Sequence, residues 1–581
     1  MSRVRRLIGW GLAILVLYSA TMAFVMLLSL TSTYEKLQTL SKGDLSESID
    51  FEQLNSVALD TQRAASAASD PALRALEFIP WLGSDIHAAR VLSTGLNETL
   101  QVLLPFVEQR DALGLNKAQL PKTLKALSLS TDSLEQAVER FDEALTSVKS
   151  NELHFGLEPK IARVKSLISD VSLAINQGNP LLKSAALMLN QPGKTRWFIA
   201  TQNASELRAA GGLIGSYAIL TIDDGKIHLD DFGADSKLLA KGQLNVSYAS
   251  GIENIWGADF TDWRDINASA HIPDDGKILA DAWKQKFGQK IDGVLFFSQG
   301  TVAHLVGSAG QVQVAGETLT HENTVDFLTK DIYAKFTDVK KKNAVVSKLM
   351  EKLFQDLTEN KVDAANLLKS LSNEKNVDDI FLWSADRNTQ QEIQRLGLSG
   401  EVPTAAGSDV IVEINNGGGN KLDAYLKASY TYELGKCGIK TWDDLNGRES
   451  KVFITLTNSA PKTGLPKYVN PRLDLRKGQK YVPSSNLEVI SVYAPVGSTD
   501  EVILVDGQDE GATFSTYREH PVYTFSVELM PGQTRTVEVT FIEPVSDTSG
   551  KDIQRKPSFR TQRTLAGTTS SVKFESFCPI G

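Results

Sequence analysis

Cysteine, histidine and excess positive charge are all scarce in this chain. It holds 2 cysteines and 7 scattered histidines in 581 residues, and neither a zinc-finger spacing nor an HExxH motif occurs. A structural metal site built from cysteine and histidine is therefore not expected. The formal net charge of −9 argues against a general nucleic-acid-binding protein, which would carry a basic face. No P-loop is present to bind a nucleotide.

The remaining composition is that of an ordinary folded protein. Hydrophobic residues make up 42% of the chain and charged residues 23%, which are common values for globular domains. The length predicts more than one domain, with about three as a reasonable starting value.

One long segment near the N-terminus lacks charge altogether. Leu7–Leu30 comprises 24 residues without a charged side chain, enough to cross a bilayer as a helix. Because Arg3, Arg5 and Arg6 precede it, residues 1–6 are predicted to be cytoplasmic and the chain after Thr31 external. A cleaved signal peptide is the alternative, although its apolar core is usually shorter. The prediction is a single-pass cell-membrane protein with its bulk outside the cytoplasm.

The external part is predicted to be a multidomain α+β structure in three regions. Residues 33–190 show apolar positions at helical spacing and predict a helical bundle, with a helix stop at Gly178-Asn179-Pro180. Between residues 196 and 398, strand-like and helix-like runs alternate, which favours a central α/β domain. From residue 409 to 581, short β-branched and aromatic runs predict an immunoglobulin-like β-sandwich. Within it, Pro544–Thr569 is predicted to be a long loop or a mobile arm.

The stretch Phe198–Leu220 is the first candidate site. A polar, glycine-bearing segment lies between two apolar runs, as in a loop presented by two core strands. Glu206 and Arg208 could bind an anionic or sugar ligand, since arginine suits phosphate. A structural ion pair is the alternative. The nearby glycines are expected to provide special backbone angles: Gly211, Gly212 and Gly215.

A second candidate is the run from residue 261 to 267, which mixes carboxylates, an arginine and a tryptophan. Asp262, Arg264 and Asn267 could bind sugar hydroxyls beside Trp263, or the charges could be solvated above a buried ring. The run Lys340-Lys341-Lys342 is most simply a solvated helix start.

Cys437 and Cys578 would lie in a compartment where disulfides persist, so a bridge between them is predicted, with two buried thiols as the alternative.

Several of these segments resemble an exported bacterial family known only as a domain of unknown function. The resemblance rests on the N-terminal segment, the Ile-Pro-Trp-Leu-Gly turn, the Gln-Asn-x-x-Glu-Leu-Arg-x-x-Gly-Gly run from residue 202 to 212, and the run from Ile291 to Val294. It implies an envelope protein and brings no settled activity.

The region from about 196 to 357 also resembles, more distantly, the LytR-CpsA-Psr phosphotransferases, which attach lipid-pyrophosphate-linked glycopolymers to the cell wall. The match departs from that family at its chemistry. Asn203 stands where a metal-binding aspartate is expected, the second aspartate position falls near Gly215, and Asp235 remains from a third motif without its arginine. Mg²⁺ is possible, but the expected carboxylates are not matched, so no cofactor or catalytic residue is assigned. The predicted function is binding of an envelope glycopolymer or its lipid-pyrophosphate carrier. The alternative is a structural or interaction protein of the envelope.

Overall fold

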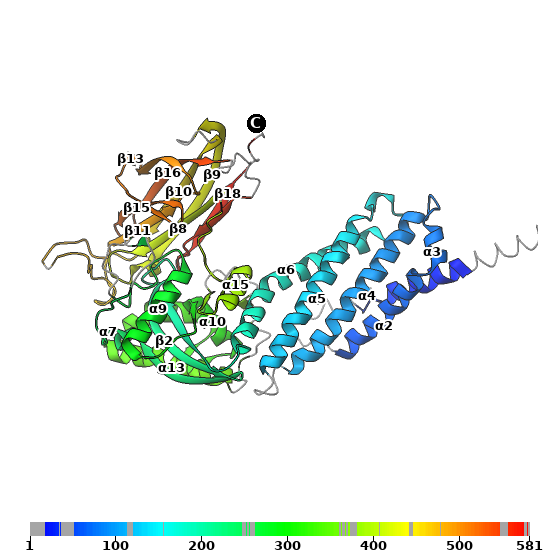
Figure 1. Cartoon of the computed structure of the whole chain (residues 1–581), viewed down its shortest axis with the longest axis horizontal. Helices are drawn as coiled ribbons and strands as arrows, with labels where there is room; N and C mark the ends of the chain where they lie inside the picture. Colours follow the sequence, from blue (N-terminus) through cyan, green and yellow to red (C-terminus); the bar gives the residue numbers. More distant parts are fainter. Residues whose placement is uncertain are drawn as a thin grey trace, which may run out of the picture. The chain divides into compact units, whose positions relative to one another are not determined.

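The computed structural model (Figure 1) forms two compact units, residues 1–190 with 363–375, and residues 191–362 with 376–581. The residues that the structure describes are 18–33, 35–36, 51–112, 120–154, 156–246, 251–252, 255, 262–358, 362, 367, 370–371, 380–405, 407–440, 446–476, 478–545, 556–574 and 578.

The first unit is helical, as predicted. Its apolar stripe of Leu134, Val138, Phe141 and Leu145 is buried in one core. The predicted stop at residues 178–180 is wrong, because the helix continues through Pro180. Tertiary contacts hold this turn: Thr131 donates to the Asn179 side chain at 2.8 Å, and Asn179 donates to Glu135 at 3.1 Å. The helices are α2 (Phe51–Ala68), α3 (Pro71–Leu76), α4 (Gly83–Ala112), α5 (Leu120–Thr146) and α6 (Glu158–Leu189).

The predicted membrane span, residues 7–30, is described only in part. Residues 7–17 lie outside the described residues, and residues 18–33 are helical. The Tyr18 hydroxyl donates to Asp70 at 2.7 Å, next to the start of α3. Within the part of the chain that the structure describes, no helix combines the length and the apolar character needed to cross a membrane.

The second unit begins with a mixed five-stranded sheet of order β3-β2-β1-β4-β7. Only β1 and β4 run parallel; every other pair is antiparallel. The alternation of strands and helices thus builds a mixed sheet. The strands are β1 (Thr195–Asn203), β2 (Leu213–Asp223), β3 (Lys226–Ala234), β4 (Gly293–Phe297) and β7 (Ile380–Ser384).

Aromatic side chains pack against this sheet, and a tight turn joins two of its strands. Trp283 packs its ring against Phe198 and Tyr217, with centroids 5.6 and 5.5 Å away. The sequence Asp223-Asp224-Gly225-Lys226 between two apolar runs predicts a hairpin turn, and the antiparallel pairing of β2 with β3 confirms it. Asp224 and Gly225 have φ of 47° and 76°, the left-handed pair that a tight hairpin turn requires. The helices are α7 (Asp235–Leu239), α9 (Ile272–Phe287), α10 (Gln299–Ser308), α11 (His321–Asp326), η2 (Phe327–Asp331), α12 (Ile332–Lys335), α13 (Val339–Thr358) and α15 (Arg387–Arg395), and β5 (Val312–Val314) pairs with β6 (Glu317–Leu319).

The C-terminal part of this unit packs two sheets around one apolar core, which gives a β-sandwich. The sheet orders are β13-β12-β16-β10-β9-β18 and β14-β15-β11-β8-β17. The strands are β8 (Asp409–Asn416), β9 (Leu426–Lys440), β10 (Asn446–Asn458), β11 (Asn486–Tyr493), β12 (Thr499–Val505), β13 (Gln508–Asp509), β14 (Thr513–Tyr517), β15 (His520–Leu529), β16 (Thr534–Pro544), β17 (Ser558–Thr561) and β18 (Thr568–Lys573).

The predicted loop Pro544–Thr569 is wrong in part. Residues 546–555 lie outside the described residues, but β17 pairs parallel with β8, and β18, which starts at Thr568, pairs parallel with β9. Both are short, polar edge strands. Their order comes from main-chain pairing with a distant strand, which a polar sequence pattern does not reveal.

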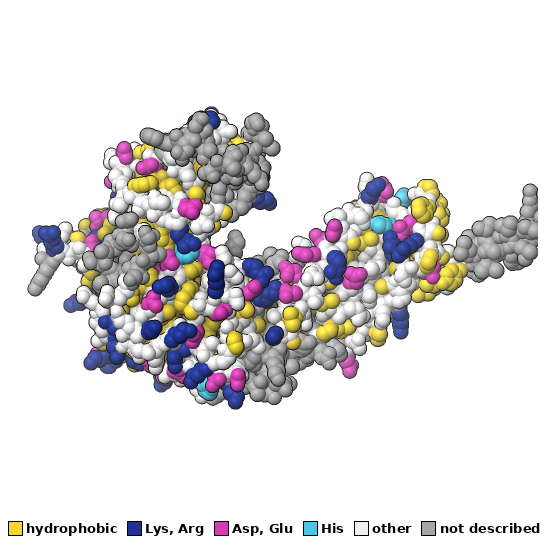
Figure 2. All heavy atoms as spheres, in the orientation of Figure 1, with side chains coloured by type: hydrophobic (Ala, Val, Ile, Leu, Met, Phe, Trp, Pro, Cys, Tyr) yellow, Lys and Arg dark blue, Asp and Glu magenta, His cyan; other side chains and the backbone are white. Residues whose placement is uncertain are grey.

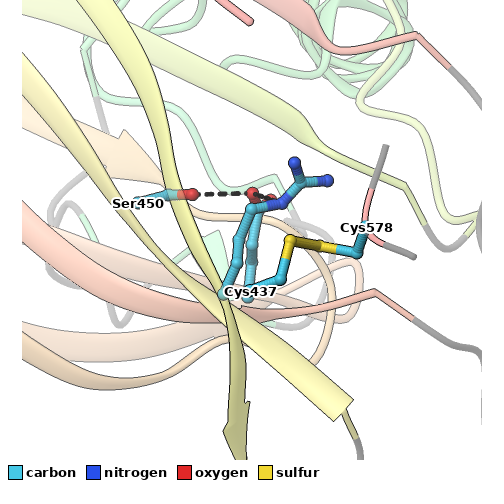
Figure 3. The surroundings of a disulfide bond; sticks show 5 residues. Cys437, Ser450 and Cys578 are labelled. Atoms are coloured by element: carbon cyan, nitrogen blue, oxygen red, sulfur yellow. Dashed lines mark hydrogen bonds and ion pairs between the residues drawn. A yellow bond between two sulfur atoms is a disulfide. The ribbon is translucent and has the colours of Figure 1, made fainter. Parts of the chain in front are cut away.

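A disulfide joins Cys437 to Cys578 across 141 positions of the chain (Figure 3). Beside it, the buried Ser450 hydroxyl donates to Glu543 at 2.7 Å, and Arg448 pairs with the same carboxylate at 3.0 Å. The bridge therefore ties the last residues of the chain to β9, next to a buried ion pair.

Candidate functional site

The segment between β1 and β2, residues 204–212, is called here the motif loop. Leu207 is fully buried within the core of the β-sandwich. Its backbone N–H donates to Asp423 at 2.6 Å, and its carbonyl accepts from the Asn416 N–H at 3.0 Å. The Asp423 N–H in turn donates to the Ser205 carbonyl at 3.1 Å. The motif loop is therefore a joint between the mixed sheet and the sandwich.

Charged side chains of the motif loop complete this joint. Arg208 donates to Glu206 at 3.1 Å and Asp265 at 3.0 Å, and also to the carbonyls of Leu207 at 2.8 Å and Arg264 at 3.2 Å. Only 8% of its side chain is exposed, and the second oxygen of Glu206 pairs with buried Lys421. Four of the five N–H donors of Arg208 are thus engaged within the protein. This geometry favours the structural alternative for Glu206 and Arg208.

Arg264 pairs with Asp262, whereas Arg208 pairs with Glu206 and Asp265. The Arg264 guanidinium donates to both oxygens of Asp262, at 3.0 and 2.6 Å. Burial acts to raise the pKa of Asp262, but the hydrogen bonds from Arg264 outweigh it and lower the pKa. The two arginines lie close together through one backbone contact, yet the Arg264 side chain is 42% exposed and that of Arg208 only 8%.

The other members of the second candidate run are buried. Trp263 is 2% exposed and belongs to the core beneath the mixed sheet, so it presents no open face to a sugar. Asn267 is fully buried and donates to the Gly212 carbonyl at 2.7 Å. A Cβ added at Gly212 would lie 2.5 Å from the backbone of Asn203, which explains the glycine at this position. Thr261 lies outside the described residues.

A pocket opens beside these residues, between the mixed sheet, α10, α12 and α13, with two side chains from the sandwich. Asn203, Gly215 and Asp235, which the sequence singled out, all line it. The polar lining residues are Thr201, Gln202, Asn203, Ser216, Asp235, Gln299, Tyr333, Lys342, Asn343, Lys421 and Tyr468.

Lys342 is one of the two lysines, with Lys421, among the described residues that line the pocket. Its Nζ lies 5.2 Å from the ring centroid of Tyr333 and 4.6 Å from that of Tyr468, and the two rings are stacked 5.7 Å apart. Burial lowers the pKa of Lys342 and raises that of Asp235, while their opposite charges act against both shifts. Of the lysine run 340–342, only Lys342 lines the pocket.

Amide side chains, among them Gln202 and Asn203, are also part of the polar lining of the pocket. Gln202 is 1% exposed, and neither its Nε2 nor its Oε1 has a hydrogen-bond partner among the described residues. Such unpaired buried groups are costly unless a ligand or water satisfies them. Asn203 donates to the Tyr333 hydroxyl at 2.7 Å. Asp235 is the one carboxylate among the described lining residues, and the described part of the chain holds no group of three histidine, cysteine or acidic residues arranged for a metal ion.

The pocket also has an apolar lining. Helices α10, α12 and α13, with η2, supply its residues: Val302, Leu328, Ile332, Val346, Leu349 and Met350. The lining of the pocket is therefore amphipathic, because it combines amides and a cation with aliphatic side chains.

Sequence reasoning missed Tyr333, Tyr468 and Gln299, and it treated Lys342 as a solvated residue. Tyr333 and Tyr468 are 135 positions apart in the sequence, and no periodicity or motif links them. A helical wheel of α13 would have placed Lys342, Val346, Leu349 and Met350 on one side of that helix, and this was the available signal.

Comparisons with known proteins give a family match for part of the chain. Residues 192–333 match a family described as "Protein of unknown function (DUF4012)". No curated protein matches. The run from residue 202 to 212 lies inside the matched segment, in agreement with the predicted resemblance to a family of unknown function. The family match is not to the LytR-CpsA-Psr phosphotransferases, so that resemblance stays a prediction.

One solved structure shows a weak likeness. It is a crystal structure of a "putative nutrient binding protein" from Legionella pneumophila, with 9% identity and a TM-score of 0.17. The likeness covers 25% of this chain and 46% of that one, less than half of its length. A likeness this weak supports no inference about fold or ligand.

Proposed function

We propose that the pocket binds an amphipathic ligand, namely an envelope glycopolymer or its lipid-pyrophosphate carrier. The supporting observation is the mixed polar and apolar lining of the pocket. Lys342 and the unpaired Gln202 amide are among its polar residues, and Leu349 and Met350 are among its aliphatic residues. A polyprenyl chain would lie along the aliphatic side chains, and its phosphate or sugar head would lie against the polar ones.

The polar lining residues of the pocket suit such a head group. The Lys342 ammonium is a point charge that binds phosphate, and the buried Gln202 amide can donate to and accept from a sugar or phosphate oxygen. Tyr468 offers a half-exposed ring on which a sugar face can stack. Transfer of the head group would be slow or absent, because one carboxylate, Asp235, is a weak basis for holding a divalent cation.

Ligand-dependent stabilisation of the full-length protein in detergent tests this proposal. Farnesyl pyrophosphate should raise the melting temperature more than farnesol or inorganic pyrophosphate does, because it alone can contact both the aliphatic and the polar lining residues. Lys342→Gln should weaken farnesyl pyrophosphate binding roughly tenfold or more, the value of a charge-assisted hydrogen bond.

The matched control is Lys341→Gln, since Lys341 is exposed on the same helix and should leave affinity unchanged. Equal loss in both variants, or no stabilisation by any of the three compounds, would contradict the proposal. Strong Mg²⁺-dependent turnover would instead show that transfer occurs.

We further propose that the chain is a single-pass membrane protein with its bulk outside the cytoplasm, on the basis of the arginines that precede Leu7–Leu30. Protease added to cells with an opened outer layer should digest the body, and the protein should sediment with membranes before digestion. A soluble product starting near residue 24 would show a cleaved signal peptide.

The second candidate, a structural or interaction protein, is supported by the motif loop. Its most distinctive residues build a joint between two parts of the unit. Failure of every pocket ligand, with an intact fold, would favour this candidate.

A further inference from the structure

The connection between β10 and β11, residues 459–485, differs in charge from the rest of the chain. It is called here the basic loop. It holds six lysines and arginines against one aspartate, a net charge of +5 in a chain whose formal net charge is −9. Nothing in the pocket explains this charge, because only Tyr468 of the loop lines it.

The loop is held in place by its inward contacts. The Arg472 side chain is 3% exposed and pairs with Asp474 at 2.7 Å and Glu528 at 2.6 Å. The Leu473 N–H donates to the Gly418 carbonyl at 2.8 Å, and the Val469 carbonyl accepts from the Lys421 N–H at 2.9 Å. The loop therefore presents its remaining side chains from a fixed base.

Those remaining side chains combine exposed apolar groups with exposed cations. Leu473 is 65% exposed, Val482 48% and Tyr481 40%. The exposed cations are Lys462, Lys467, Arg476 and Lys480. In Figure 1 the loop extends away from the sandwich as a long gold segment, and Figure 2 shows lysine and arginine side chains at its end.

We propose that the basic loop docks on an anionic lipid bilayer. Cations alone would fit any polyanion, but aliphatic and aromatic side chains among them fit a surface with an acyl region beneath its phosphates. Each lysine or arginine near an anionic bilayer strengthens binding roughly fivefold. The inference goes beyond the pocket's ligand and does not depend on it. Because Tyr468 belongs to both, docking would bring the bilayer next to the pocket.

A fluorescent label tests contact between loop and lipid, whether or not the chain is also anchored by its N-terminal segment. The full-length protein carries an environment-sensitive dye at Tyr481→Cys and is reconstituted in nanodiscs that contain a quencher attached to lipid. The dye should be quenched in phosphatidylglycerol and not in phosphatidylcholine, and high salt should relieve the quenching. A dye at Val502→Cys, an exposed position on β12, should stay unquenched in both lipids.

Two pairs of substitutions separate charge from apolar contact. Lys467→Gln with Lys480→Gln should lower the docked-to-free ratio roughly 25-fold, which is fivefold for each cation. Leu473→Ser with Val482→Ser should lower it several-fold without changing its salt dependence. The matched control, Lys284→Gln with Lys436→Gln, changes two exposed lysines on other elements and should have no effect.

Unchanged melting temperatures would show that these variants fold. The proposal is overturned if the loop dye is unquenched in phosphatidylglycerol or if the control pair acts as strongly as the loop pair. Soluble polyphosphate is the competing ligand in a further control. If it binds the loop as tightly as lipid does and the serine pair has no effect, the partner is a soluble polyanion and the bilayer is excluded.

Discussion

At the scale of single residues, burial distinguishes side chains that have similar neighbours in the sequence. Arg208 and Arg264 each lie among carboxylates in the sequence, and each was predicted to contact a ligand. The structure encloses Arg208 within four hydrogen bonds, whereas Arg264 pairs with Asp262 at the surface. Their substitutions should therefore act on different properties.

Arg208→Ala should destabilise the fold by about 3 kcal/mol, the lower part of the range for breaking a buried pair, because Glu206 keeps Lys421. Arg264→Ala should cost less than about 1 kcal/mol, as for exposed pairs. Urea unfolding of both variants measures this difference. Equal losses, or a stable Arg208→Ala protein with weakened ligand binding, would restore the binding role predicted from the sequence.

Glu413 gives a prediction of pH dependence. It is fully buried on β8 and accepts from the Tyr493 hydroxyl at 3.0 Å. Burial raises its pKa from 4.5 to about 8, against the opposing effects of Tyr493 and Arg560. The folded state thus prefers the protonated acid. The resulting stability is complete below about pH 4.5 and is lost as the pH rises through 8.

The free energy of unfolding should accordingly fall between about pH 5 and 8, by at most about 1.4 kcal/mol per pH unit from this group. Glu413→Gln keeps an acceptor for Tyr493 and should remove this part of the slope. Chemical denaturation at several pH values, compared between the two proteins, isolates the effect. Parallel curves would show that Glu413 does not titrate in this range.

At the scale of elements, the motif loop couples two structures through one apolar side chain and several backbone hydrogen bonds. Leu207 comes from the connection between β1 and β2, yet it packs among core residues of the sandwich. Because Leu207 is part of the sandwich core, we expect the mixed sheet and the sandwich to fold and unfold together.

Leu207→Ala should destabilise the protein by about 2–5 kcal/mol, because it leaves a cavity in that core. The unfolding of the sheet and the sandwich should also become less cooperative, which calorimetry would detect as a broadened or divided transition. Ala209→Gly, in the same loop, is the control for backbone flexibility. A single sharp transition with unchanged stability in Leu207→Ala would contradict the joint.

At the scale of the whole molecule, the disulfide is the one covalent link between distant parts of the chain. It closes a segment of 141 positions, for which the chain-entropy model gives roughly 4–5 kcal/mol as an upper figure. Cys437→Ser with Cys578→Ser should lower the melting temperature, and reduction of the native protein should have the same effect. Two free thiols in freshly isolated protein would contradict the bridge.

The sequence by itself determined the parts whose signal is local. The apolar stripe of Leu134–Leu145, the turn at Asp224-Gly225 and the runs that become β10 and β16 each depend on neighbours within a few positions. The continuation of α6 through Pro180 and the edge strands β17 and β18 depend on partners far along the chain, so the local sequence patterns gave wrong predictions there. The candidate site also depends on partners far along the chain. Burial decides whether Arg208 binds a ligand or supports the fold, and whether Lys342 faces solvent or a pocket. This burial arises only in the tertiary structure, where Lys421 and Tyr468 of the sandwich meet the mixed sheet.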